Sequence, residues 1–201
     1  MTHIIYDFEF NTAFKIDRQT RLLLKGDAHP ECPQEIIEIG AVRLNEHLEI
    51  EDSFQLMIKP TLYQKMHPKI KQKTKITWEE LEMGIPFGEA IQAFREWIPT
   101  DEPVMGSWGM DDHQELVRNC GFHQLETQWF QRHLDIQKLC MQHMGMPKGH
   151  QIGLKKAVEH FGIQVENSFH KALHDAIYTA HVYRALKEVQ QEEARDLEKA
   201  Q

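Results

Sequence analysis

The sequence lacks the features that place a chain in a membrane or in an oxidising compartment. No apolar run approaches the roughly 20 residues that span a bilayer, and the N-terminus has no apolar signal-peptide segment. The three cysteines, Cys32, Cys120 and Cys140, are scattered, odd in number and without a Cys-x-x-Cys spacing. We therefore expect a cytoplasmic protein with reduced thiols, no membrane partner, no disulfide framework and no structural zinc site.

Positive charge is also scarce, because 23 Lys and Arg oppose 31 Asp and Glu, for a net charge of −8 at pH 7. This acidity argues against nonspecific coating of duplex nucleic acid, which needs a basic surface. It does not exclude a nucleic-acid enzyme, because local charge and bound metal decide what enters a cleft. Residues 59–75 depart from the acidic average with six lysines and no acid. They fit either a solvated loop or a contact for a phosphate backbone.

The order of expected elements predicts one α/β domain over residues 1–201. Three stretches rich in β-branched and aromatic residues predict consecutive strands, which form a meander: 4–10, 35–44 and 53–58. We expect a long loop between the first two strands. Short strands at 103–109 and 133–136 then alternate with helices, such as an amphipathic helix over 87–98. The pattern predicts a mixed sheet with helices on both faces.

Local signals predict where several helices begin and end. Thr77-Trp-Glu-Glu80 has the spacing of a capping box, and Gly84 should end the short helix that follows. A helix beginning at Asp111 should turn Leu116, Val117 and Cys120 inward. A long last helix begins near Lys171, and we expect its charged final turns, residues 190–201, to fray.

Two acids interrupt the first expected strand. Because side chains alternate along a strand, Ile5, Asp7 and Glu9 share one face, and the aromatic residues share the other. Two neighbouring carboxylates repel each other, and burial would raise their pKa values. A hard cation such as Mg²⁺ or Mn²⁺ would relieve this repulsion, whereas acids at a solvated strand end need no partner. The pair alone leaves both interpretations open.

Further acids stand at the beginnings of two helices. Asp111 and Asp112 follow the strand at 103–109, where acids also favour a helix macrodipole without any other role. Asp175 lies about one and a half turns into the last helix, and His170 stands at its start. Taken singly, Asp175 would form a surface ion pair with Lys171, and His170 would be a helix-start histidine bonded to a carbonyl. Together with Asp7 and Glu9, they predict a metal-dependent hydrolase.

The motifs, in this order, resemble those of the DnaQ-like DEDDh 3′–5′ exonucleases of the ribonuclease H-like superfamily. They extend from residue 4 to about residue 187: Asp7-Phe-Glu9, the aspartate after Gly106-Ser-Trp-Gly109, and His170-x-Ala-x-x-Asp175-Ala. The stretch Pro33-x-Glu-Ile-Ile-Glu-Ile-Gly-Ala-Val42 is similar to the Eri/KapD-type subgroup. Where that subgroup commonly has Thr-Gly-Ile, this chain has Thr74-Lys75-Ile76. The implied fold is a ribonuclease H-like mixed sheet, with a meander of about three strands and two shorter strands.

The resemblance implies the residues and the cofactor of the site. Asp7, Glu9, Asp112 and Asp175 would hold two Mg²⁺ or Mn²⁺ ions, and His170 would be the general base. The substrates would be 3′ ends of RNA or single-stranded DNA, released as nucleoside 5′-monophosphates. The motifs do not tell whether the substrate is RNA or DNA, and they carry no information on the oligomeric state.

Two assignments of site residues have alternatives. Asp111 is an alternative to Asp112; we favour Asp112 because Leu116 then falls four residues later, as in the subgroup. The backbone groups of Phe8 and Phe10 and the ring of Trp108 are candidates to hold the terminal nucleotide. A core position is the alternative for Trp108.

Two other functions compete with the nuclease. A haloacid-dehalogenase-like phosphatase also has an acidic first strand and a later Asp-Asp pair, but it needs Asp-x-Asp where this chain has Glu9. It also leaves the motif from His170 to Asp175 unused. A non-catalytic nucleic-acid-binding protein on the same fold is the second alternative. Against it, all five predicted catalytic positions are intact.

Overall fold

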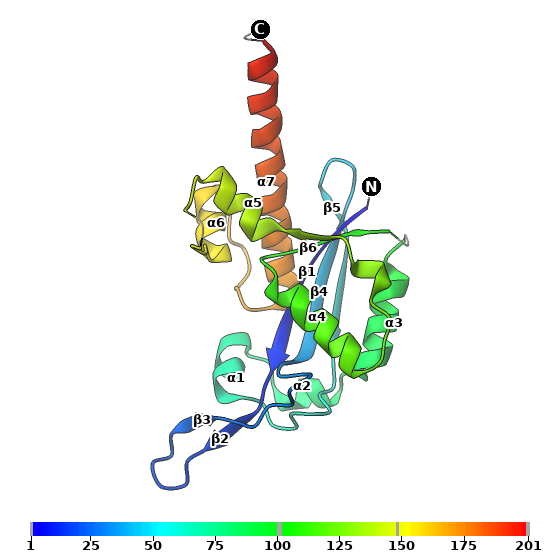
Figure 1. Cartoon of the computed structure of the whole chain (residues 1–201), viewed down its shortest axis with the longest axis vertical. Coiled ribbons are helices and arrows are strands. Elements are labelled where there is room, and N and C mark those ends of the chain that lie inside the picture. The colour runs from blue at the N-terminus through cyan, green and yellow to red at the C-terminus, as the bar shows by residue number, and fades with distance from the viewer. Residues whose placement is uncertain (1, 100–101, 148, 200–201) are drawn as a thin grey trace.

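A five-stranded mixed sheet organises the chain in a computed structural model that describes residues 2–99, 102–147 and 149–199 (Figure 1). The strand order is β5-β4-β1-β6-β7. The strands are β1 (His3–Asn11), β4 (Glu35–Leu44), β5 (Ile50–Met57), β6 (Val104–Ser107) and β7 (His133–Asp135). β4 runs antiparallel to β1 and β5, whereas β6 runs parallel to β1 and β7. The predicted meander with two shorter strands is confirmed.

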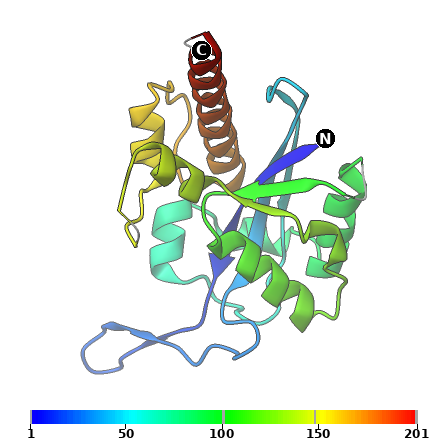
Figure 2. The same cartoon turned by 45° about the horizontal axis from the view of Figure 1, so that its top comes forward.

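Helices cover both faces of this sheet (Figures 1 and 2). The side chains of β1 alternate between two cores, as its pattern predicts: Ile4, Tyr6 and Phe8 lie in one, and Ile5 lies in the other. The first core includes residues of α3 (Phe87–Trp97) and α4 (Asp111–Phe122). The second includes residues of α5 (Ile136–His143), α6 (Leu154–His160) and α7 (Ala172–Lys199). The expected helix over 87–98 is thereby confirmed within one residue.

Two short helices lie beyond the end of β5, and local capping determines where they begin. α1 (Pro68–Thr74) begins with a proline at its first position, and the His67 side chain accepts a hydrogen bond from the Lys69 amide. α2 (Trp78–Glu82) has the predicted capping box between Thr77 and Glu80. α1 ends at Lys75 with a φ of 62°, a left-handed conformation that favours glycine. The backbone at Lys75 thus has the conformation that suits the glycine of the Thr-Gly-Ile pattern.

Three sequence predictions need correction. The expected loop between the first two strands contains a hairpin of β2 (Phe14–Ile16) and β3 (Leu23–Lys25), whose exposed side chains give no burial pattern. The lysine-rich segment is likewise more than a loop, because it contains α1. Val117 is 42% exposed, so only Leu116 and Cys120 of its predicted group face inward. Residues Gln128–Phe130 form a 3₁₀ turn.

The last helix is continuous to Lys199, and its final turns project from the body of the molecule (Figure 1). The fraying expected over residues 190–201 stays a prediction, and residues 200–201 lie outside the described part. The three cysteines are buried free thiols, as predicted. No helix of the described residues has both the length and the apolar character needed to cross a membrane.

Candidate active site

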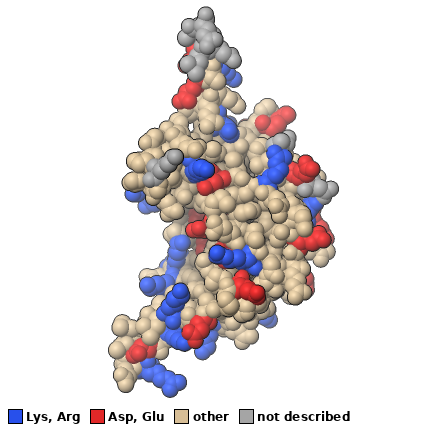
Figure 3. Space-filling view, in the orientation of Figure 1, with Lys and Arg blue, Asp and Glu red and all other residues tan. Residues whose placement is uncertain are grey.

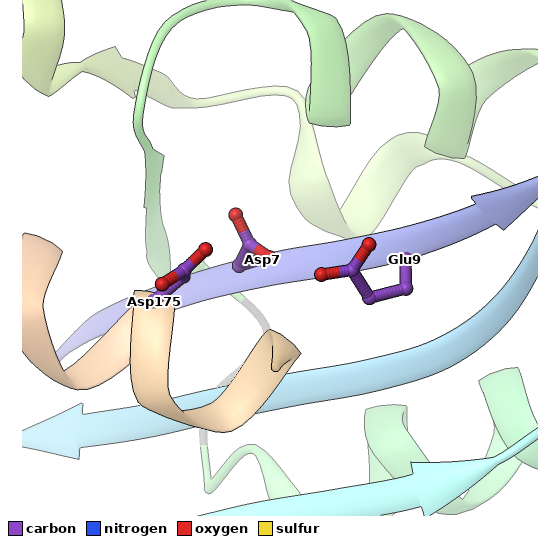
Figure 4. A group of neighbouring side chains, drawn as sticks. All are labelled: Asp7, Glu9 and Asp175. Carbon is purple, nitrogen blue, oxygen red and sulfur yellow. The ribbon is translucent and has the colours of Figure 1, made fainter. Parts of the chain in front are cut away.

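Three of the four predicted acids meet above the middle of the sheet (Figure 4). Asp7 and Glu9 project from the same face of β1, and Asp175 projects from the beginning of α7. One carboxylate oxygen of each lies within 4.8 Å of the others. Segments more than 160 residues apart in the sequence thus bring three carboxyl groups into one space.

A glycine of β4 allows the beginning of α7 to lie directly against the sheet. Gly40 pairs with Asp7 across the sheet, and a Cβ atom at Gly40 would lie 2.0 Å from the Leu173 nitrogen. The same Cβ would lie 2.1 Å from the carbonyl carbon of Ala172, so no side chain fits there. The carboxylate of the fully buried Glu38 accepts a hydrogen bond of 3.4 Å from the Ala172 amide. Sequence reasoning missed both residues, although a glycine within a β-branched strand is a signal of close backbone approach.

The fourth acid reaches the site from α4. Asp112 is 7% exposed, and its Oδ1 accepts a hydrogen bond of 3.0 Å from the Phe8 amide, next to Asp7. Its neighbour Asp111 is exposed to solvent. Of the two candidates, Asp112 is therefore the one in contact with β1.

His170 stands directly before α7, as its position in the motif predicts. Its backbone has a φ of 69°, and its amide donates a hydrogen bond of 3.2 Å to Oδ2 of Asp175. The imidazole is exposed and makes no hydrogen bond with any described residue. Partial desolvation, with the positive charge of Lys73, lowers the pKa of His170 and so favours the neutral imidazole. Asp175 forms no ion pair with Lys171 among the described residues.

Burial makes the acid cluster unfavourable without a counter-charge. It raises the pKa of Glu9 to about 8, that of Asp112 to about 7 and that of Asp175 to about 6. It also raises the pKa of Asp7 well above its usual value, and repulsion from the neighbouring acids adds to this effect. Lys73, which sequence reasoning did not single out from the other lysines, partly offsets the charge at Glu9 and Asp175.

The cluster fits a divalent cation. Oδ1 of Asp175 is buried and has no hydrogen-bond partner, so a ligand bond is open to it. The three residues all offer carboxylate oxygens, and no cysteine is among them. Oxygen ligands of this kind suit a hard ion such as Mg²⁺ or Mn²⁺. A bound cation would also favour the ionised forms that burial disfavours.

The aromatic candidates for nucleotide binding have structural partners. The Phe8 side chain is buried, and its amide is bonded to Asp112. Phe10 packs against the core on the α3 side of the sheet. Trp108 is half-buried against the other core, and its Nε1 donates a hydrogen bond of 3.1 Å to the Ile152 carbonyl. These contacts give Trp108 a role in packing, and its contact with a nucleotide stays a prediction.

Comparison with known proteins places the chain in a family. A family model described as exonuclease (RNase_T) matches residues 4–183. A probable 3′–5′ exonuclease KapD of Bacillus subtilis (strain 168) is 29% identical over 159 residues, which cover 79% of this chain and 74% of that protein.

Solved structures of nucleases share the fold. The nuclease domain of 3′hExo, a DEDDh family member bound to rAMP, has a TM-score of 0.74 at 23% identity, over 94% of this chain and 92% of that one. Escherichia coli exonuclease I in complex with a dT13 oligonucleotide has a TM-score of 0.70 at 15% identity, over 98% of this chain and 43% of that one. The predicted ribonuclease H-like fold and the resemblance to DEDDh exonucleases are confirmed. With residues 4–183 of 201 matched, the chain belongs to the RNase_T family of exonucleases.

Proposed function

We propose that the chain is a 3′–5′ exonuclease that removes nucleoside 5′-monophosphates from the 3′ ends of RNA or single-stranded DNA. The observation that carries the proposal is the meeting of Asp7, Glu9 and Asp175 within 4.8 Å, in a chain of the exonuclease family. The 3′–5′ direction follows the name of the Bacillus subtilis relative. The rAMP and dT13 bound to two structural relatives support both RNA and DNA as substrate classes.

We assign the four acids to the binding of two Mg²⁺ or Mn²⁺ ions. Asp7, Glu9 and Asp175 present oxygens to one space, and Asp112 approaches it from α4. When bound, the ions supply Lewis-acid stabilisation of the charge on the phosphate oxygens and on the leaving oxygen. The raised pKa values of the acids support this role, because ionised carboxylates crowded together need a cation.

The chain's own residues then account for the proton transfer. His170, whose lowered pKa favours the neutral imidazole, takes a proton from the water that attacks the terminal phosphorus. The bond from phosphorus to the 3′-oxygen of the preceding nucleotide breaks, and that oxygen takes up a proton. General base catalysis of this kind contributes about 10²–10⁴-fold to the rate. The hydrogen bond from the His170 amide to Asp175 links the position of the base to that of a ligand.

An end-labelled strand tests the proposal. With Mg²⁺ or Mn²⁺, a 5′-labelled single strand should give a descending ladder of products, and chelator should stop the reaction. Asp112→Asn should abolish the ladder, whereas the exposed Asp111→Asn is the matched control and should retain it. A single internal cut, or activity in Asp112→Asn equal to that in the control, would contradict the assignment.

The two competing functions lack a supporting observation. The family match includes the segment from His170 to Asp175, which a haloacid-dehalogenase-like phosphatase would leave unused. A non-catalytic binding protein would not need four acids with raised pKa values around one space. We also propose that the enzyme works in the cytoplasm, since its three buried free thiols suit a reducing compartment.

A further inference from the structure

We propose that hairpin β2–β3 and helix α1 form a basic arm that binds the phosphodiester backbone of the substrate strand, on the 5′ side of its terminal nucleotide. The basic arm comprises residues 14–25 and 65–75. The inference rests on the proposed function and extends it, because it says where the rest of the strand lies once the 3′ end reaches the acids. Nothing in the motifs of the active site implies the hairpin.

Charge is the first support for the basic arm. Residues 14–25 contain four basic residues and one acid, and residues 65–75 contain five lysines and no acid, in a chain with a net charge of −8. Figure 3 shows Lys and Arg side chains gathered over α1 and the hairpin, at one end of the molecule. A concentration of positive charge on an acidic protein draws a polyanion to that end.

Most of these charges have no carboxylate partner among the residues that the structure describes. Lys15 pairs with Asp27 at 2.5 Å. In contrast, Arg18, Arg21 and Lys25 are exposed, and no carboxylate of the described residues lies within ion-pair distance of them. The same holds for the lysines of α1. Cations without a carboxylate partner can neutralise phosphates, and a phosphate backbone that binds to them releases its counterions.

The tip of the hairpin is ordered by its own hydrogen bonds. Oδ1 of Asp17 accepts from the Gln19 amide at 2.9 Å and from the Thr20 amide at 2.6 Å, and it also accepts from the Thr20 hydroxyl. The Arg21 amide then bonds to the Asp17 carbonyl at 3.0 Å. The two arginines of the turn are therefore presented on a defined backbone, which reduces the entropy lost when a ligand binds.

The hairpin is connected to α1 at its base. The rings of Phe14 and His67 lie 5.3 Å apart, edge to face, and Asn11 at the end of β1 binds the His67 amide and the Lys65 carbonyl. At its other end, α1 places Lys73 close enough to the acid cluster to lower the pKa of Glu9. Positive charge thus continues from the cluster, along α1, to the tip of the hairpin.

A groove lies at the base of the hairpin. It has a volume of about 380 Å³, and its lining includes Phe14, Tyr63, Lys65 and the ion pair of Lys15 with Asp27. Proteins that bind single-stranded nucleic acid combine aromatic rings with lysines: the bases stack on the rings, and the phosphates contact the cations. Ile16, Leu22 and Leu24 are 51%, 62% and 47% exposed on the hairpin, and they offer further apolar surface to sugars and bases.

A variant that removes three charges from the hairpin tests the arm: Arg18→Gln, Arg21→Asn and Lys25→Gln together. Asparagine is chosen at Arg21 because its φ of 61° is left-handed, a conformation that asparagine tolerates. We expect kcat/KM for a long single strand to fall about 10- to 30-fold at low salt, mainly through KM. Hydrolysis of the p-nitrophenyl ester of thymidine 5′-monophosphate, which is too short to reach the hairpin, should be unchanged.

Salt dependence gives a second readout. Each phosphate contact on a single strand contributes about 0.7 to the slope of log affinity against log salt, so the slope should decrease by about 2. The matched control removes three exposed charges from other surfaces, with Lys155→Gln, Lys156→Gln and Arg195→Gln. The variant that retains charge at the hairpin, with lysine for both arginines and arginine for Lys25, should behave like the wild type.

Each outcome bears on one proposal. If the wild type hydrolyses both substrates and the hairpin variant matches the control, the arm is refuted while the nuclease stands. If the wild type hydrolyses neither substrate, the proposed function fails. Unchanged thermal unfolding of the hairpin variant, which alters exposed side chains only, will show that a loss of activity does not come from unfolding.

Discussion

Replacing Glu9 by glutamine should stabilise the metal-free protein while it removes nuclease activity. Glu9 is only 7% exposed, and burial raises its pKa from 4.5 to about 8. A raised pKa means that the folded state binds the proton more tightly than the unfolded chain. The ionised side chain therefore destabilises the fold, and the loss of stability develops as the pH rises from 4.5 to about 8.

The size of this effect follows from the pKa shift. One pKa unit corresponds to about 1.4 kcal/mol, so the full shift corresponds to about 4 kcal/mol at pH 8 and to less than about 1 kcal/mol at pH 5. Relaxation of the site and entry of water reduce the value at pH 8 to about 2–4 kcal/mol. Glutamine has nearly the same shape as glutamate and carries no charge, so it removes this cost.

Urea unfolding in the presence of chelator measures the difference. With a slope of about 2 kcal/mol per molar urea, the midpoint of Glu9→Gln at pH 8 should lie about 1–2 M above that of the wild type. At pH 5 the two midpoints should nearly coincide. Added Mn²⁺ should stabilise the wild type more than the variant, because the variant has lost a ligand. Glu126→Gln, at an exposed position, is the matched control and should change neither midpoint. A variant that is no more stable than the wild type at pH 8 would refute the reasoning.

Three further substitutions test other parts of the account. Gly40→Ala should displace the beginning of α7, destabilise the fold by about 2 kcal/mol or more and abolish activity; wild-type activity would contradict the close approach. His170→Ala should lower kcat by about 10²–10⁴-fold with little change in the KM of a labelled strand, and an unchanged kcat would exclude it as the base. Lys75→Gly should raise the free energy of unfolding by about 0.5–1 kcal/mol, because the left-handed φ of 62° suits glycine; a loss of stability in thermal unfolding would show otherwise.

The central sheet could be predicted because its strands carry strong local signals. β4 is buried along nearly its whole length and consists mainly of β-branched and small residues, so its predicted bounds, 35–44, agree with the structure. The alternation in β1 placed Asp7 and Glu9 on one face for the same reason. The hairpin β2–β3 could not be found in this way, because most of its side chains are exposed and its turn depends on side-chain bonds from Asp17.

The candidate site could be proposed from the sequence as a set of residue types, but much less as a geometry. The order of Asp7, Glu9, Asp112 and Asp175 resembled a known family, and the structure brings three of them within 4.8 Å. What the sequence did not reveal are the contacts that hold them there, such as the missing side chain of Gly40. Such contacts depend on tertiary packing between β4 and α7: the small buried residues of α7 and the glycine of β4 each suggest a close approach, but neither segment says which other segment it approaches.

Titration of the metal-free protein with Mn²⁺, followed by calorimetry, tests the central claim most directly. The claim is that acids from β1, α4 and α7 together form the metal site of the nuclease. The wild type should bind two ions at pH 8, and Asp7→Asn should lose this binding together with its activity. Full binding by Asp7→Asn, or no binding by the wild type, would contradict the claim.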